Sequence, residues 1–273
     1  RMDKEQKAIE RLKLAAEMSE TYYGKPLIVT TSGGKDSDVC IALALAAGIN
    51  FEVQHNHTTA DAPETVYHVR DTVRRLEAKG IQCTVNWPTY KGAPVTMWSL
   101  IPQKLVPPTR LMRYCCSVLK EGGGAGRMIT TGVRWAESAA RRNKRGVYEK
   151  LSQDTSKRII INNDNDDKRQ LFENCRLQAK RVCNPIVDWT DNDVWDYIRS
   201  EHIETNPLYA CGFDRVGCVG CPMAGKKGRQ TSYLTSQPKK FIVFIARFQK
   251  GRFLIPDQEF SGHTSRSLAD SLK

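Results

Sequence analysis

The first half of the chain alternates between two patterns of apolar and polar residues. One pattern places apolar residues on a single helical face, and the other is a short run rich in apolar and β-branched residues. Together they predict, in order, a helix at 3–20, a strand at 27–30, a helix at 39–47, a strand at 51–54, a helix at 63–79 and a strand at 82–86. Strands alternating with helices predict a parallel sheet with helices on both faces.

The second half is less regular, because four prolines between positions 94 and 108 interrupt the pattern. Residues 141–170 are so polar that we expect a loop there. The acidic run at 162–167 within it lacks the ligand spacing and the glycine of a calcium site. The remaining predicted elements are a helix at 111–120, a strand at 128–132 and a helix that the capping residues 188–191 start and that runs through 198.

The chain carries a net charge of +12 over 273 residues, and 40% of its residues are hydrophobic. That length and content suffice for one large domain or for a domain with a small appendage. The positive charge favours phosphate-rich ligands, which include nucleotides, DNA and RNA. No apolar run approaches the ~20 residues that cross a bilayer, and residues 1–20 lack the apolar centre of a signal peptide. We therefore expect a cytoplasmic protein without a membrane partner.

Nine cysteines, an odd number in a chain without a secretion signal, argue for reduced thiols rather than a disulfide framework. Two tight pairs suggest metal ligation, the adjacent Cys115 and Cys116 and the Cys218-x-x-Cys221 turn. Four thiolates suit either a tetrahedral zinc ion or a [4Fe–4S] cluster, and spacing alone does not separate these.

The other five cysteines fall into two groups. Cys175 and Cys211 are substitute ligands, because adjacent cysteines do not readily point at one cluster. Cys40, Cys83 and Cys183 lie in apolar strand or helix patterns, where a buried thiol acts as a small hydrophobic side chain. We expect this second group to belong to the core.

A glycine-containing loop follows the predicted strand at 27–30 and opens the next predicted helix. Its residues are Ser32, Gly33, Gly34, Lys35, Asp36 and Ser37. In this position backbone N–H groups and the helix N-terminus face an anion, and the glycines allow a tight turn. Lys35 adds a positive charge, the serine hydroxyls can donate to phosphate, and Asp36 could hold Mg²⁺ or fix the loop. We expect Lys35 and Asp36 to be exposed. The loop is not a Walker motif, which has different spacing.

This loop resembles the PP-loop of enzymes that bind ATP and release pyrophosphate while adenylating a substrate. Further segments are similar to the phosphoadenosine phosphosulfate reductase family and occur in its order, at 57–65, 113–120, 132–141, 184–189 and 217–222. The resemblance implies a Rossmann-like sheet of the adenine nucleotide alpha hydrolase type. We expect a nucleotide-binding domain at 1–200 and a cluster-binding region at 201–273 packed on it. The resemblance also favours a [4Fe–4S] cluster over zinc.

The same resemblance implies which residues outside the loop face the nucleotide: Gly132, Arg134, Ser138 and Arg141. If their segment is helical, Arg134 and Arg141 are neighbours two turns apart, and planar guanidinium groups fit phosphate bidentately. In the implied reaction Lys35, Arg134 and Mg²⁺ neutralise charge on the phosphates as it develops. Arg141 also belongs to a basic run at 141–145 that could be a solvated face.

The sequence departs from the family at the nucleophile. Sulfonucleotide reductases use a cysteine in a C-terminal Glu-Cys-Gly motif, and no cysteine follows Cys221 here. Lys35-Asp36 is also the pair found in ATP-using relatives. We therefore expect the chain to resemble most the reductase-like proteins of DNA phosphorothioation and CRISPR-associated systems.

Three functions stay open. The first is an ATP pyrophosphatase that activates an acceptor, such as DNA or RNA, for sulfur transfer, with a sulfur-donor or effector-complex protein as partner. The second is a sulfonucleotide reductase whose nucleophile comes from elsewhere, such as Cys211 or a partner. The third is a non-catalytic nucleotide- or nucleic-acid-binding module with a structural cluster or zinc. Pyrophosphate release from ATP would separate the first from the others.

Overall fold

The computed structural model describes residues 2–120, 122–150, 159–161 and 181–224. Its main sheet has seven strands in the order β3-β2-β1-β6-β9-β7-β8. The bounds are β1 Leu27–Thr31, β2 Phe51–Asn56, β3 Cys83–Asn86, β6 Met128–Thr130, β7 Tyr148–Lys150, β8 Ile159–Ile161 and β9 Arg181–Cys183. β3, β2, β1, β6 and β9 are parallel, while β7 is antiparallel to both β9 and β8. The expected parallel α/β sheet is therefore confirmed, with two antiparallel strands added at one edge.

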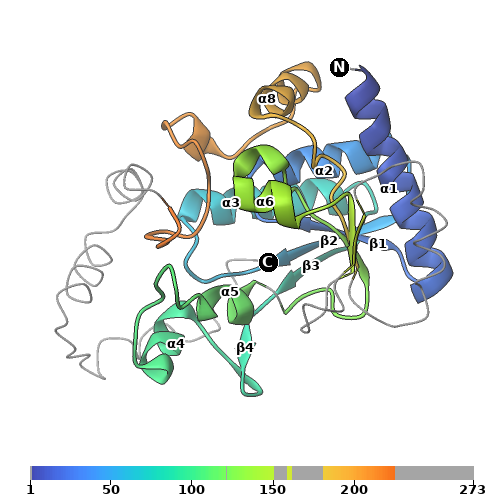
Figure 1. Ribbon diagram of the computed structural model, residues 1–273. Helices are drawn as coiled ribbons and strands as arrows, with labels where there is room; N and C mark the ends of the chain where they lie inside the picture. Colours follow the sequence, from blue (N-terminus) through green and yellow to red (C-terminus); the bar gives the residue numbers. More distant parts are fainter. Residues whose placement is uncertain (1, 121, 151–158, 162–180, 225–273) are drawn as a thin grey trace.

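The helices surround this sheet (Figure 1). Their bounds are α1 Met2–Tyr23, α2 Lys35–Ala46, α3 Pro63–Glu77, α4 Met97–Lys104, α5 Tyr114–Leu119, α6 Ala139–Lys144 and α8 Asp191–Ser200, with 3₁₀ turns η1 at Trp135–Glu137 and η3 at Pro207–Tyr209. In the view of Figure 1, α2 and α3 lie above β2 and β3, and α4 and α5 lie below them. A short hairpin, β4 Thr89–Tyr90 and β5 Ala93–Pro94, extends beside α4.

Both faces of the central strands are buried. Leu27 and Val29 of β1 belong to the large core cluster that includes α1 and α2, whereas Ile28 between them packs with Ile129 and Val182 in a separate cluster. Alternate side chains of a strand point to opposite faces, so the two clusters lie on the two sides of the sheet. Burial on both sides explains why β1 reads as a continuous apolar run.

The order of the strands reverses at β1. The chain proceeds outward through β2 and β3 on one side of β1 and then returns to form β6 on its other side. In open α/β sheets the crevice outside the carboxyl ends of the strands at such a reversal is the usual ligand site. The Gly-containing loop follows β1 directly and residues 131–134 follow β6, so both candidate phosphate-binding segments meet there.

Several elements differ from the sequence-based expectation. The prediction of a loop over 141–170 is wrong at α6, β7 and β8. The acidic run at 162–167 lies outside the described residues. α4 is also unexpected, since Pro102 lies inside it. It begins with a capping box in which Thr96 accepts from the Ser99 backbone, and Pro102 lies in its last turn. Within the described residues, no helix combines the length and apolar character needed to span a membrane.

Residues 201–224 pack against the main body, and 225–273 lie outside the described residues. The Val219 N–H donates to the Ala60 carbonyl at 2.8 Å, and Val219 joins Ala62 and Leu208 in a small apolar cluster. This cluster lies beside the start of α3. The proposed boundary at residue 200 coincides with the end of α8, and whether 201–273 forms a unit of its own stays a prediction.

A buried ion pair connects α1 to the segment that leads into α8. The Arg11 guanidinium is 5% exposed and donates to both carboxylate oxygens of Asp188, at 2.8 and 3.1 Å, and to the Pro185 carbonyl at 2.9 Å. Removing one partner of such a pair leaves a charge with too little compensation in the interior.

We expect Asp188→Ala to lower the free energy of unfolding by about 3 kcal/mol, because Arg11 stays buried. Urea denaturation measures this change. The matched control is Asp196→Ala, which removes a pair with Arg199 whose side chains are 48% and 67% exposed, and we expect a change within about 0.5 kcal/mol. Equal effects of the two substitutions would contradict the importance of the buried pair.

Candidate functional site

The loop between β1 and α2 is a tight turn that requires glycine. Gly33 has φ +69°, and a Cβ there would lie 2.9 Å from the γ-methyl groups of Thr65 and Val69 on α3. Asn206, which is 1% exposed, holds the turn from the other side by donating to the Gly33 carbonyl at 3.0 Å. An alanine at Gly33 would meet both a steric clash and an unfavourable backbone conformation.

The two loop serines have different surroundings. Ser32 is exposed. Ser37 is buried, donates to the Gly34 carbonyl at 2.7 Å and accepts from the Ser32 N–H at 3.3 Å. Both serines were expected to donate to phosphate, but in this structure the Ser37 hydroxyl braces the loop from within. Ser32 has the exposed side chain of the two.

Lys35 is 3% exposed, so the expectation of an exposed lysine is wrong. It is the first residue of α2, and its ammonium lies 3.1 Å from Asp191 Oδ1. The rings of Trp195 and Tyr209 lie near the ammonium, with centroids 5.8 and 5.5 Å away, and the Lys35 N–H donates to the Tyr209 hydroxyl at 2.9 Å. The aromatic rings and the carboxylate together compensate the buried charge.

Arg134 joins three segments of the chain at the strand reversal. It is 3% exposed and donates through Nε to Asp36 Oδ1 at 2.8 Å and through Nη2 to Asp191 Oδ1 at 2.9 Å. Because Lys35 also contacts Asp191, two cations and two carboxylates form one connected network. We call Lys35, Asp36, Arg134 and Asp191 the charge network.

The two carboxylates of the charge network differ in their pKa. Burial raises the pKa of Asp36 above its usual value, although Arg134 and Lys35 oppose the change. Burial also acts on Asp191, but hydrogen bonds from Lys35 and Arg134 outweigh it and lower its pKa. Asp191, at the first position of α8, was expected only as a capping residue. Acidic residues in a first helical turn are common, so the sequence offered no further signal.

The segment after β6 places the other predicted nucleotide residues. A Cβ on Gly132 would lie 2.8 Å from the backbone carbon of Asp36, so only glycine allows this close approach to α2. Ser138 caps α6 by accepting from the Arg141 N–H at 3.2 Å, and the Arg141 guanidinium pairs with Glu137. Arg134 precedes η1 and Arg141 lies in α6, so the segment between them is not one helix and the condition for placing them two turns apart is not met.

The paired cysteines come together near the carboxyl ends of β2 and β3. Cys115 and Cys116 lie on α5, and Cys115 and Cys218 pack on the same apolar cluster. The nearby charges of Cys218 and Cys221 contribute to raising the Cys115 pKa, after a hydrogen bond to Cys116 and burial. We call Cys115, Cys116, Cys218 and Cys221 the cysteine group. Of the proposed substitutes, Cys211 is exposed and Cys175 lies outside the described residues.

Lys120, the residue directly after α5, was not singled out by the sequence. Burial alone would lower its pKa, but the charges of Cys218 and Asp61 outweigh this effect and raise it. The Lys120 ammonium favours the ionised form of Cys218, which is the form that binds metals, but burial outweighs this effect and raises the Cys218 pKa.

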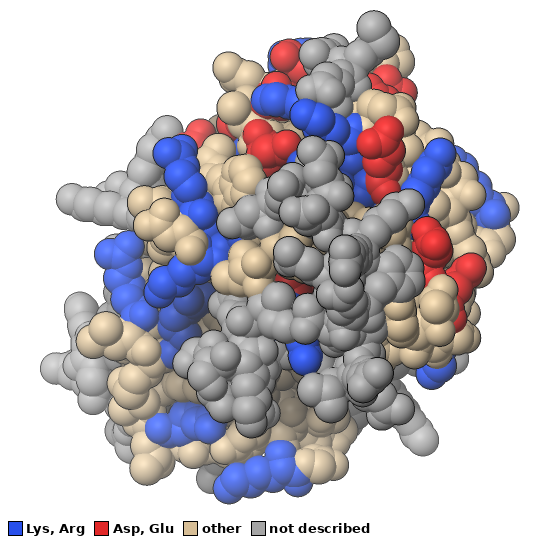
Figure 2. Space-filling view, turned by 45° about the vertical axis from the view of Figure 1, so that its right-hand side comes forward, with Lys and Arg blue, Asp and Glu red and all other residues tan. Residues whose placement is uncertain are grey.

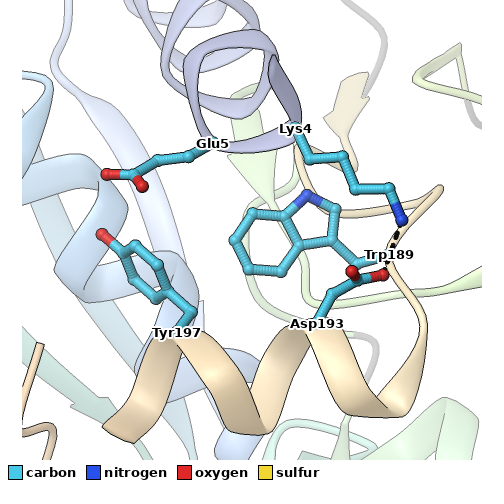
Figure 3. A pocket seen from close by; sticks show the side chains of 5 residues that line it. All are labelled: Lys4, Glu5, Trp189, Asp193 and Tyr197. Carbon is cyan, nitrogen blue, oxygen red and sulfur yellow. Dashed lines mark hydrogen bonds and ion pairs between the residues drawn. The ribbon is translucent and has the colours of Figure 1, made fainter. Parts of the chain in front are cut away.

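A small hollow near the N-terminus is separate from these residues (Figure 3). It is lined by Lys4, Glu5, Trp189, Asp193 and Tyr197, and Lys4 closes one side through an ion pair of 2.6 Å with Asp193. Its volume of about 10 Å³ offers room for a single water molecule at most. A nucleotide does not fit there.

The architecture defines an α/β protein with a glycine-containing anion loop at the reversal of its strand order. A family model, the phosphoadenosine phosphosulfate reductase domain, matches residues 26–224. The chain belongs to this family, which confirms the resemblance seen in its motifs and places it in the PP-loop superfamily.

The relatives that match most of this chain are less than 30% identical to it. An uncharacterized protein of Methanocaldococcus jannaschii is 28% identical over 208 residues, which are 72% of this chain and 36% of that protein. A Staphylococcus haemolyticus adenosine 5'-phosphosulfate reductase is 24% identical, covering 73% of this chain and 71% of its own. This chain spans only 36% and 40% of the two M. jannaschii relatives it matches.

Solved structures with a similar fold include a phosphoadenylyl-sulfate reductase from Candida auris in a phosphate complex. It has a TM-score of 0.47 and 16% identity, and the match covers 77% of this chain and 87% of that one. A Candida glabrata FMN adenylyltransferase in complex with ATP has a TM-score of 0.45 and 13% identity, covering 90% and 80%.

The cysteine group generates a prediction about thiol reactivity. A hydrogen bond from Cys115 lowers the pKa of Cys116 to about 5, and Arg113, which lies 3.5 Å from its sulfur, adds to the effect. Burial raises the pKa of Cys83 to about 11. Because a lowered pKa gives thiolate at neutral pH, we expect iodoacetamide to alkylate Cys116 of metal-free protein at pH 6.5 at close to its maximal rate, and Cys83 very slowly.

Peptide mapping by mass spectrometry measures both rates between pH 4 and 9. In Arg113→Ala the inflection of the Cys116 profile should move to higher pH. A Cys116 rate that climbs steadily from pH 6 to 8 would show that its pKa is not lowered.

Proposed function

We propose that this chain is an enzyme that binds ATP or a related adenosine nucleotide at the loop from Ser32 to Ser37, releases pyrophosphate and activates an acceptor for sulfur transfer. The observation that carries the proposal is the charge network beside this loop at the strand reversal. Buried cations are costly unless they serve a ligand or a structural pair. Here Lys35 and Arg134 converge from two segments on the crevice where α/β proteins bind ligands.

The charge balance supports a nucleotide bound with a metal ion. Lys35 and Arg134 are balanced by Asp36 and Asp191, so a triphosphate would bring an excess of negative charge. Mg²⁺ prefers carboxylate and phosphate oxygens, and the two carboxylates accept from the same guanidinium. Asp36 and Asp191 therefore fit as magnesium ligands, and the ion would neutralise charge on the phosphates.

In the proposed reaction an acceptor oxygen attacks the α-phosphorus of ATP. A bond forms between that oxygen and phosphorus, the bond to the bridging α–β oxygen breaks, and its electron pair leaves with pyrophosphate. Lys35 and Arg134 would stabilise the charge that develops on the phosphate oxygens. The loop backbone and the start of α2 would orient the phosphates, and Gly33 and Gly132 allow the segments to approach.

We further propose that the cysteine group binds a [4Fe–4S] cluster. Cys115 and Cys218 pack on one apolar cluster, the charges of Cys218 and Cys221 act on Cys115, and Lys120 provides a positive charge beside Cys218. Thiolate ligands and a nearby ammonium suit an anionic iron–sulfur cluster. The cluster would supply redox or sulfur-handling capacity beside the nucleotide site. Zinc is the alternative occupant of the same thiolates.

A sulfonucleotide reductase is the second candidate, because the family and the S. haemolyticus relative carry that activity in their names. Such an enzyme would bind the same adenosine nucleotide core but release sulfite. Cys211 is exposed in the turn after η3, and it or a residue of a partner would be the nucleophile. Pyrophosphate assayed from ATP and sulfite assayed from adenylyl sulfate distinguish the two candidates.

Nucleic acid is the acceptor that the charge distribution favours. Figure 2 shows Lys and Arg side chains along the left and lower parts of one face, with Asp and Glu gathered toward the top and right. Within the basic run, Arg141 and Arg145 are paired with Glu137 and Glu149, which leaves less charge for a phosphate backbone than the sequence indicates. The second basic run, at 226–229, lies outside the described residues.

Lys35→Met tests the nucleotide site, because it keeps the aliphatic stem and removes the charge. Losing a charged phosphate contact costs ~1.5–3 kcal/mol, so we expect ATP to bind roughly 10- to 100-fold more weakly. The control is Lys25→Met, an exposed lysine before β1 at the opposite end of the strand, where affinity should not change. Calorimetry that gives equal ATP affinities for both variants would remove the assigned site.

Iron content tests the cluster. Anaerobically prepared protein should contain about four irons per chain. We expect Cys218→Ser and Cys221→Ser to lose the iron and the brown chromophore, while Cys83→Ser, a half-buried cysteine on β3, keeps both. Stoichiometric zinc without iron after strictly anaerobic expression would contradict the cluster and retain the ligands.

A further inference from the structure

Two histidines and an aspartate form a group that belongs neither to the charge network nor to the cysteine group. His55 lies near the end of β2, His57 follows the strand, and Asp61 lies in the loop before α3. One ligand atom from each lies within 4.8 Å of the other two. The histidine side chains are buried, with 5% and 7% exposure. Their i, i+2 spacing places both imidazoles on one face of the strand.

Hydrogen bonds orient His55 and Asp61. Among the described residues, no hydrogen bond is seen between His55, His57 and Asp61 themselves. His55 Nδ1 lies 3.0 Å from the Thr31 carbonyl, and because a carbonyl only accepts, Nδ1 carries the proton and Nε2 keeps its lone pair. Asp61 Oδ2 accepts from the Thr58 hydroxyl at 2.6 Å. The edge of the Trp87 ring lies against His57, with centroids 4.6 Å apart.

This arrangement has the two features that accompany metal ligands in proteins. A ligating histidine donates its other ring N–H to a carbonyl or carboxylate, and a ligating carboxylate is itself hydrogen-bonded. Both are present, at Thr31 and Thr58. Two imidazoles and one carboxylate select zinc and similar transition ions, whereas Mg²⁺ prefers oxygen ligands alone.

We propose that His55, His57 and Asp61 bind one divalent transition-metal ion of the zinc type, with coordination positions left open for a further ligand. The site lies between the two others. His55 is paired with Thr31, the last residue before the phosphate loop, and Thr58 lies 3.5 Å from the Cys218 sulfur. An ion here is separate from nucleotide-bound magnesium and from a metal on the cysteine group.

The test uses the full chain, purified anaerobically, treated with a chelator and titrated with Zn²⁺ in the absence of nucleotide. X-ray absorption separates the two metal sites, because zinc–nitrogen and zinc–oxygen distances are about 2.0–2.2 Å and zinc–sulfur distances about 2.3 Å. We expect one zinc per chain in a nitrogen and oxygen shell, whatever occupies the thiolates. Zinc in a sulfur-only shell, or no zinc retained, would overturn the proposal.

Three substitutions and one control assign the ligands. We expect Asp61→Asn and His57→Ala to lose the nitrogen and oxygen shell, and Thr58→Val to weaken zinc binding about 10- to 100-fold by freeing the Asp61 carboxylate. His202→Ala, an exposed histidine after α8, should bind zinc as the unsubstituted protein does. Circular dichroism confirms that each variant is folded. Unchanged zinc affinity and shell in folded Asp61→Asn would overturn the assignment. The zinc measurements do not depend on ATP binding, so the nucleotide site is tested separately.

Discussion

The buried guanidinium of Arg134 is the interaction on which the candidate site depends. It ties the start of α2, through Asp36, to the start of α8, through Asp191, and it belongs to the segment that follows β6. Three parts of the chain far apart in sequence therefore meet at one side chain. Its charge is compensated only while both carboxylates stay in place, because an unpaired guanidinium in the interior is costly. The fold brings the strands together, and Arg134 then holds the start of α2 beside the start of α8.

The sequence predicted the elements whose signals are local. β1 and α2 are continuous apolar runs, β2 and α3 have clear apolar periodicity, and the order of strand, loop and helix pointed to Gly33 and Lys35. β8 was missed although its three isoleucines are β-branched, because the polar residues around them indicated a loop. β7 was missed because it lies in a polar region, where pairing with β9 rather than composition decides the structure. The burial of Lys35 was missed for a similar reason. The residues that surround it lie far away in the sequence: Asp191, Trp195 and Tyr209.

Parallel strands place chemically different groups side by side. The loop after β1 carries the glycines proposed to bind phosphate, two histidines lie at and just after the end of β2, and Cys218 of the cysteine group lies near Thr58. The first two sets follow from strands that end at the same edge of the sheet, whereas the cysteines come from α5 and from the segment after η3. A nucleotide, a metal ion and a cluster could therefore act on one substrate without a large movement of the chain. The interior of the sheet only has to keep the strand ends in register.

The Tyr209 hydroxyl accepts the Lys35 N–H at 2.9 Å, and burial raises its pKa to about 12, so the phenol stays neutral. It occupies the place at the helix N-terminus where an anionic oxygen would otherwise lie. A ligand that takes this N–H has to displace the phenol, and Tyr209 lies on the same segment as Cys218 and Cys221. The Tyr209 hydroxyl and an incoming anionic oxygen would therefore compete for the same N–H at the start of α2.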